Sequence, residues 1–153
     1  MTLTLTSTDF DHAGTIPVEH TCDGLNRSPA FAWSGAPEGT RSFLLTCENP
    51  DAPGGTFHHW AAYNIQPEWK GLEPGFGAGS RPRGFQQAVN DFGNPGYGGP
   101  CPPEGDLAHR YHFRLSALSD RIEAPEGASC AEIRELARPL EIADAKLIGY
   151  YGR

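Results

Sequence analysis

Alternating apolar and polar residues predict β-strands over much of this chain. The clearest alternation begins at His109, where the odd positions through Ala117 hold mostly aromatic and aliphatic residues and the even positions hold arginine, histidine or serine. His109 and Tyr111 are therefore expected on the same face at the start of a strand. The same period, or a short apolar run, predicts further strands at residues 2–7, 31–33, 42–47, 58–65, 87–90 and 147–151.

One short helix is predicted near the C-terminus. Ser129 and Glu132 have the spacing of a capping box, and apolar residues recur behind them at helical intervals, at positions 133, 136, 137 and 140. Pro139 is expected to end this helix near Arg138.

Glycine and proline separate these elements. The 19 glycines and 14 prolines favour short strands joined by many loops, with the main connections at 9–29, 48–56, 66–86 and 91–108. A chain of 153 residues is long enough to bury a core. We therefore expect a mostly β fold in a single domain over residues 1–153.

Acidic side chains outnumber basic ones by 19 to 12, which gives a formal net charge of −7, and the chain has no Lys- or Arg-rich run. This balance argues against nucleic acid as a partner. The N-terminus lacks the basic and apolar regions of a signal peptide, and no apolar run approaches the roughly 20 residues that cross a bilayer. The sequence thus predicts a cytoplasmic protein without a membrane span.

The four cysteines, at positions 22, 47, 101 and 130, show none of the C-x-x-C spacing of zinc or redox sites. Four reduced thiols are the favoured interpretation. A redox pair between Cys22 and Cys101 is the alternative, since both lie in polar loops. His20 and Cys22 are metal-ligand types, but no partner ligands follow at a suitable spacing, so no metal or other cofactor is expected.

Polar residues gather where loops meet the predicted strands, on three separate segments. If the sheet brings these junctions together, two imidazoles and a phenol supply hydrogen-bond donors, and a carboxylate accepts or orients a histidine. Backbone N–H groups around Gly98 and Gly99 are expected to add donors. Such a pocket suits phosphate or a phosphomonoester, whereas the alternative is that these are ordinary sheet residues. The side chains concerned are those of Asn49, Asp51, His59, His109 and Tyr111.

A metal-dependent hydrolase is a second interpretation, because several residues in these segments are metal-ligand types. Strand alternation places His58 opposite to His59 and His112 opposite to His109, which argues against shared coordination. No G-x-S-x-G motif marks a serine nucleophile. We therefore predict a protein that is not an enzyme and has no catalytic residue.

Several ordered motifs extend over nearly the whole chain. They are Asn49-Pro50-Asp51-Ala52-Pro53, His59-Trp60, Gly98-Gly99-Pro100-Cys101-Pro102-Pro103 followed by His109-Arg110-Tyr111, and around these Cys22-Asp23-Gly24, Ser28-Pro29, Trp33-Ser34-Gly35 and Tyr151-Gly152-Arg153. Together these motifs resemble the phosphatidylethanolamine-binding protein family, and specifically its bacterial and archaeal Raf-kinase-inhibitor-like branch.

This resemblance implies a large central antiparallel sheet, a smaller second sheet, a short C-terminal helix and a small anion pocket. By position, Asp51, His59, Gly99, His109 and Tyr111 match the family's pocket residues. Members of the family bind phosphate and phosphorylethanolamine, and some inhibit kinases or serine proteases by protein contact. The resemblance also makes a homodimer plausible.

One position departs from the family's pattern. Its proline-rich motif usually begins with aspartate, whereas this chain has Asn49. Because one negative charge is missing from the pocket edge, we expect the site to favour bare phosphate over an ammonium-bearing head group. The sequence thus indicates a non-catalytic binding or regulatory protein. The alternative is an inhibitor that acts through its surface loops and keeps a vestigial pocket.

Overall fold

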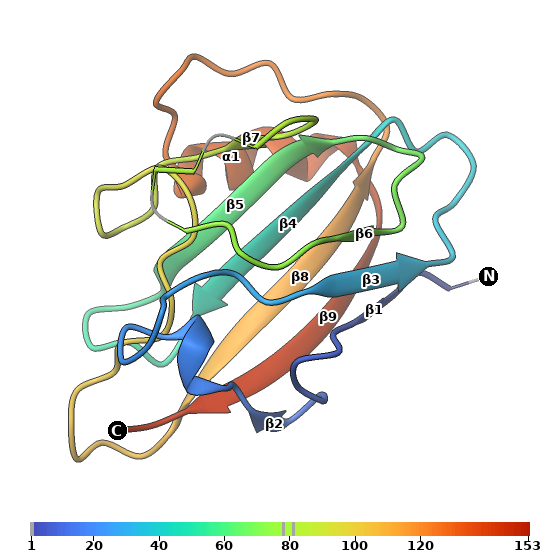
Figure 1. The fold of residues 1–153 in the computed structure, drawn as a ribbon. Helices are drawn as coiled ribbons and strands as arrows, with labels where there is room; N and C mark the ends of the chain where they lie inside the picture. Colours follow the sequence, from blue (N-terminus) through green and yellow to red (C-terminus); the bar gives the residue numbers. More distant parts are fainter. Residues whose placement is uncertain (1, 78, 81) are drawn as a thin grey trace.

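Two β-sheets packed face to face form the framework of the protein (Figure 1). The structure, a computed structural model, describes residues 2–77, 79–80 and 82–153. The small sheet has the strand order β1-β3-β6, and the large sheet has the order β2-β9-β8-β4-β5-β7. The strands are β1 Thr4–Thr6, β2 Gly14–Thr15, β3 Phe31–Ser34, β4 Ser42–Asn49, β5 Phe57–Ile65, β6 Gly71–Leu72, β7 Gln86–Gln87, β8 His109–Leu118 and β9 Glu141–Tyr151.

The long strands of the large sheet pair in antiparallel fashion, β5 with β4, β4 with β8 and β8 with β9. The short strand β2 joins β9 in parallel at the edge. Along β8, His109, Tyr111, Phe113 and Leu115 are buried, whereas the residues between them are more exposed. The predicted alternation is therefore confirmed, and His109 and Tyr111 share the face that looks toward the small sheet.

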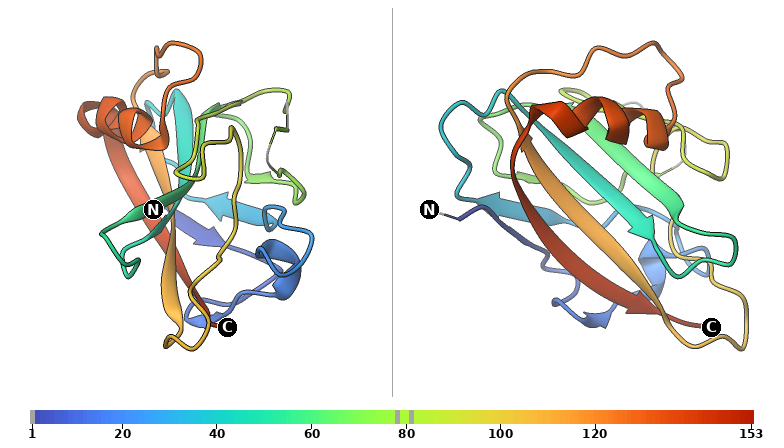
Figure 2. Two further views of the ribbon diagram at one scale, coloured as in Figure 1. Left: turned by 90° about the vertical axis from the view of Figure 1, so that its left-hand side faces the viewer. Right: turned by 180° about the vertical axis from the view of Figure 1, so that it is seen from behind.

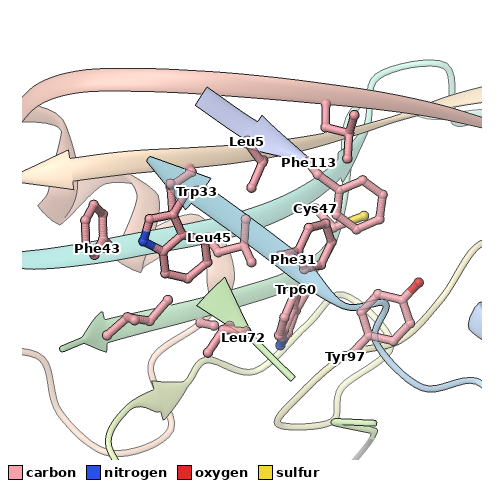
Figure 3. Packing of buried hydrophobic residues seen from close by; sticks show 14 of the residues in the cluster. Leu5, Phe31, Trp33, Phe43, Leu45, Cys47, Trp60, Leu72, Tyr97 and Phe113 are labelled. Carbon is pink, nitrogen blue, oxygen red and sulfur yellow. The ribbon is translucent and has the colours of Figure 1, made fainter. Parts of the chain in front are cut away.

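Aromatic side chains from both sheets fill the space between them. Figure 3 shows Phe31 of β3 close to Trp60 and Phe113 of the large sheet, with ring centroids 6.2 and 5.1 Å away. Trp33 of the same strand packs on Phe43, with 5.4 Å between ring centroids. Each such buried side chain stabilises the fold by roughly 1.5–3 kcal/mol. This packing fixes the small sheet on the large one.

The helix α1, Cys130–Ala137, lies on the opposite face of the large sheet (Figure 2). The Ser129 hydroxyl accepts a hydrogen bond from the Glu132 N–H at 3.1 Å, and the Glu132 carboxylate accepts one from the Ser129 N–H at 3.2 Å. This confirms the predicted capping box. Ile133 of α1 belongs to a second buried cluster that includes Leu44 and Tyr63 of the sheet.

The predicted strands are present, with different bounds in several cases. The strand expected at 42–47 continues to Asn49, and the last strand begins at Glu141 because its polar face pairs with Arg114 of β8. The bounds predicted for the strand at 87–90 are wrong, since only Gln86–Gln87 form β7. The 66–86 connection contains β6, and the 9–29 loop contains β2 and a 3-10 turn, Val18–His20.

The helix ends at Ala137 and continues as a 3-10 turn, Arg138–Leu140, which agrees with the stop expected from Pro139. Among residues 2–77, 79–80 and 82–153, no helix is both long enough and apolar enough to cross a bilayer.

Candidate functional site

A cavity of about 210 Å³ opens where β4 ends and where β5 and β8 begin. Four of the residues predicted for the site, Asn49, His59, His109 and Tyr111, meet there. Among the residues that the structure describes, those that line the cavity are Asn49, Ala52, Pro53, Phe57, His59, Phe92, Cys101, Pro102, Pro103, His109 and Tyr111. The loops before β5 and before β8 therefore form the walls around the strand ends.

A shift in strand register places His59 in this cavity. Cys47 of β4 pairs with Trp60, but the next residue, Glu48, pairs with His58, so His59 is an additional residue in β5. Such a bulge re-aims a side chain. The His59 ring is only 3% exposed and packs edge-on against Tyr111, with 5.3 Å between ring centroids.

The tautomer of the His59 ring follows from its hydrogen bond to the backbone. Its Nδ1 lies 2.7 Å from the Gly98 carbonyl oxygen, which can only accept, so Nδ1 carries the proton. Burial lowers the pKa of His59 to about 4, although the hydrogen bonds to the backbone at Gly98 and Gly99 oppose this shift. At neutral pH the other ring nitrogen, Nε2, is therefore a hydrogen-bond acceptor.

Tyr111 lines the cavity and carries an unpaired hydrogen-bond donor. Its side chain is fully buried, and its hydroxyl oxygen has no hydrogen-bond partner in the part of the chain that the structure describes. Burial raises the pKa of the phenol, so it stays protonated at neutral pH. Because buried polar groups are normally paired, this hydroxyl indicates a position for a ligand acceptor.

Asn49 and His109 hold each other in place at the cavity edge. The Asn49 carbonyl oxygen accepts a hydrogen bond from the Asp51 N–H at 2.8 Å, which orients the amide. Its NH₂ group therefore donates to Nδ1 of His109 at 3.0 Å. Nε2 of His109 consequently carries the proton and donates to Asp106 at 3.3 Å. Both ring nitrogens of His109 are thus bonded within the protein.

Asp51 was predicted in the pocket but does not line it. Its carboxylate accepts hydrogen bonds from the backbone N–H, Nε and Nη2 of Arg110, at 2.9, 3.0 and 2.8 Å. These hydrogen bonds to Arg110 lower the pKa of Asp51 to about 2. Asp51 therefore joins the loop before β5 to the start of β8, beside the cavity.

The prediction of free backbone donors at Gly98 and Gly99 is wrong. The Gly98 N–H donates to the His59 carbonyl oxygen at 3.0 Å, and the Gly99 N–H donates to the Asn26 side chain at 2.7 Å. Gly99 is required for packing instead, because a Cβ there would lie 2.1 Å from the His20 carbonyl oxygen. Neither N–H is left for a ligand.

The preference for four reduced thiols is also wrong. Cys22 and Cys101 form a disulfide with their Cα atoms 5.4 Å apart, whereas Cys47 and Cys130 are buried free thiols. The half-cystine at 101 lines the cavity, so the bond ties its wall to the 3-10 turn region. Disulfides persist in oxidising compartments and are rare in the cytosol, whereas the cytoplasmic location was predicted from the N-terminal sequence alone.

The aromatic wall of the cavity was not predicted from the sequence. Phe57 and Phe92 contact each other with 4.7 Å between ring centroids, and both rings pack against His59. Phe92 is 45% exposed. A large apolar side chain in a glycine-rich loop was the available signal for it.

His58 and His112 lie on the opposite face of the sheet, as the alternation predicted. Both are neighbours of Glu48, with His58 Nδ1 3.6 Å from its carboxylate and His112 paired with it in register. The histidines considered as metal ligands of a hydrolase thus lie on two opposite faces of the large sheet.

Nearly the whole chain is similar to proteins of a known family. The model of the family described as "Phosphatidylethanolamine-binding protein" matches residues 6–152. A UPF0098 protein of Methanothermobacter thermautotrophicus is 44% identical, over 94% of this chain and 95% of its own length. The chain therefore belongs to the phosphatidylethanolamine-binding protein family, as its motifs predicted.

Solved structures agree with this assignment. Escherichia coli YbcL, described as a member of the mammalian PEBP family, has a TM-score of 0.92 at 34% identity, and the match covers 100% of this chain and 99% of YbcL. A carboxypeptidase Y inhibitor solved with its cognate proteinase has a TM-score of 0.62 at 16% identity, over 99% of this chain and 83% of the inhibitor. The second likeness shows the fold alone.

Proposed function

We propose that the cavity binds a small phosphate-type anion, either free phosphate or a phosphomonoester, and that the protein is a non-catalytic binding or regulatory module. The unpartnered hydroxyl of the fully buried Tyr111 carries this proposal. A phosphoryl oxygen is a strong acceptor and satisfies that donor. The volume of about 210 Å³ and the apolar wall leave room for a small organic group on the phosphate.

A hydrogen bond between His59 and a ligand oxygen requires a proton between them. None of the described residues that line the cavity is a Lys, Arg, Asp or Glu. Nε2 of neutral His59 is an acceptor, so a ligand oxygen bonds to it through a proton that comes either from solvent or from the phosphate itself. Protonation from solvent gives an imidazolium, whose positive charge then balances the anion.

The absence of a carboxylate from the lining supports a preference for bare phosphate. Asn49 stands where the family usually has aspartate, and Asp51 is already paired with Arg110. An ammonium-bearing head group therefore has no anionic partner among the lining residues. Calorimetric titration of the protein with phosphate and with phosphoethanolamine measures this preference directly.

We expect phosphate to bind at least as tightly as phosphoethanolamine, and we expect Asn49→Asp to shift the ratio toward phosphoethanolamine by a fewfold, because a screened charge contact is worth on the order of 1 kcal/mol. Asn94→Asp, which adds the same charge at an exposed position outside the lining, is the control. Tighter binding of phosphoethanolamine by the unaltered protein would contradict the preference.

A second candidate is an inhibitor that acts through surface loops on a kinase or protease, alone or as a homodimer. Its support is the fold likeness to the carboxypeptidase Y inhibitor. A carboxypeptidase assay with excess protein tests it, and inhibition that survives Tyr111→Phe would favour this candidate over the pocket. A metal-dependent hydrolase has no such support, because His58 and His112 lie on the opposite face of the sheet from His59 and His109.

A further inference from the structure

A second polar cluster lies outside the cavity, at the 3-10 turn that precedes the disulfide. Asp9, Glu19 and His20 each place one metal-ligating atom there, and these atoms lie within 4.8 Å of one another. We propose that these three side chains bind one divalent transition-metal ion, with Zn²⁺ as the best match to the donors. The sequence spacing gave no sign of this, because Asp9 precedes Glu19 and His20 by ten and eleven positions.

The tautomer of His20 leaves a nitrogen lone pair aimed at the two carboxylates. Nδ1 lies 2.9 Å from the Arg27 carbonyl oxygen and must donate to it, so Nε2 is unprotonated in the neutral ring. Nε2 lies 3.6 Å from the nearer Asp9 oxygen and 3.8 Å from a Glu19 oxygen. Three acceptors that face one another repel unless a cation lies between them.

The burial of His20 makes this arrangement more than an acidic surface cluster. The residue is only 1% exposed, and Nε2 has no hydrogen-bond partner among the described residues. An unpaired buried polar atom costs on the order of 1–3 kcal/mol. A metal ion bound at Nε2 removes that cost.

The separations fit tetrahedral coordination. Zinc binds imidazole nitrogen and carboxylate oxygen at roughly 2.0–2.2 Å, which places two ligands of a tetrahedron about 3.3–3.5 Å apart. The two separations from Nε2 of His20, 3.6 and 3.8 Å, need a contraction of only a few tenths of an ångström. The two carboxylate oxygens lie within 4.8 Å of each other, and because both side chains are partly exposed they are free to approach an ion. Mg²⁺ and Ca²⁺ prefer oxygen ligands alone, so the buried imidazole favours zinc.

Each of the three ligands is already oriented by a neighbour. His20 is held through Nδ1 by the Arg27 carbonyl, Asp9 accepts a hydrogen bond from the Ala30 N–H at 2.7 Å, and Glu19 is held by the Arg27 guanidinium at 2.9 Å. Outer contacts of this kind orient the ligands of metal sites. The Asp9 and Glu19 side chains are 27% and 42% exposed, so an ion and a water ligand can reach them.

A proton is the competing occupant, because an imidazolium also satisfies the two carboxylates. Calorimetric titration of the full, tag-free protein with ZnCl₂ at pH 7 separates the two. We expect one ion per chain, at least a tenfold loss of affinity in Glu19→Gln and in Asp9→Asn, and a rise in melting temperature with Zn²⁺ that these variants lose.

Glu135→Gln is the matched control, because Glu135 forms an exposed ion pair with Arg138 at the same 2.9 Å as Glu19 with Arg27. It should bind Zn²⁺ like the unaltered protein. Both carboxylates are partly exposed, so their variants are expected to fold even where a substitution of buried His20 does not. Absence of saturable binding, or equal affinity in Glu19→Gln and Glu135→Gln, would overturn the proposal and leave a proton as the occupant.

Discussion

At the scale of a single residue, His59 makes the stability of the folded protein depend on pH. Its pKa is lowered to about 4 in the folded protein, mainly by burial, while an unfolded histidine titrates near 6.5. Between these values the unfolded chain binds more protons than the folded one, so stability falls as the pH is lowered through this window.

The loss at pH 4 relative to pH 7 should be about 3 kcal/mol from this residue. Denaturant unfolding at several pH values measures it. In His59→Asn, which keeps an N–H for the Gly98 carbonyl, the acid-dependent part of the loss should largely disappear. An identical pH profile in the two proteins would show that His59 does not titrate this way.

The same residue predicts how anions bind. Sulfate carries no proton at neutral pH, so it can reach Nε2 of His59 only after the ring takes one from solvent. Sulfate affinity should therefore fall by up to about tenfold for each unit of pH above 5, whereas phosphate, which brings its own proton, should depend less on pH. Competition titrations from pH 5 to 8 test this, and parallel pH profiles for the two anions would contradict the role of Nε2.

At the scale of elements, the short helix α1 depends on its N-cap residue, Ser129. The Ser129 hydroxyl satisfies the Glu132 N–H at the start of α1, and α1 covers the second core cluster. Ser129→Ala should lower the free energy of unfolding by about 1 kcal/mol. Ser119→Ala, at an exposed site outside the helix, serves as the control in urea unfolding, and an equal effect of the two substitutions would argue against the cap.

The strands show which features of the fold the sequence pattern predicts and which it does not. The alternation from His109 to Ala117 predicts the two faces of β8, and the capping box predicts the start of α1. Alternation also separates His58 from His59, but it assumes an unbroken period. The bulge that brings both His59 and Trp60 to the inner face arises from pairing with β4, which a local pattern does not contain.

At the scale of the whole molecule, the remaining features depend on contacts between distant segments. Gly99 looks like a backbone donor in its own loop, but the fold places Asn26 against its N–H. Asp51 looks like a pocket acceptor until Arg110 is brought beside it. The family motifs predicted which segments meet, but only the structure shows which polar groups are already bonded when they do.

The disulfide is the longest of these connections, with 79 residues of sequence separation between Cys22 and Cys101. Because it closes a long loop, its reduction should cost about 2–5 kcal/mol of stability. It should also weaken phosphate binding, because Cys101 lines the cavity. Thermal unfolding with and without reductant measures the first effect, and a Cys22→Ser/Cys101→Ser variant should be insensitive to reductant. If reductant leaves the melting temperature of the unaltered protein unchanged, the disulfide does not stabilise the fold.

The anion pocket itself is tested most directly by calorimetric titration of phosphate into the unaltered protein and into Tyr111→Phe. This substitution removes a hydroxyl that bonds to no described residue, so the fold should keep its stability. Tyr63→Phe, in the cluster on the other face of the sheet, is the matched control. We predict that phosphate affinity falls about ten- to 100-fold in Tyr111→Phe, since a hydrogen bond to a charged group is worth roughly 1.5–3 kcal/mol, and that Tyr63→Phe leaves it unchanged. Equal phosphate affinity in all three proteins would show that the Tyr111 hydroxyl does not face the ligand.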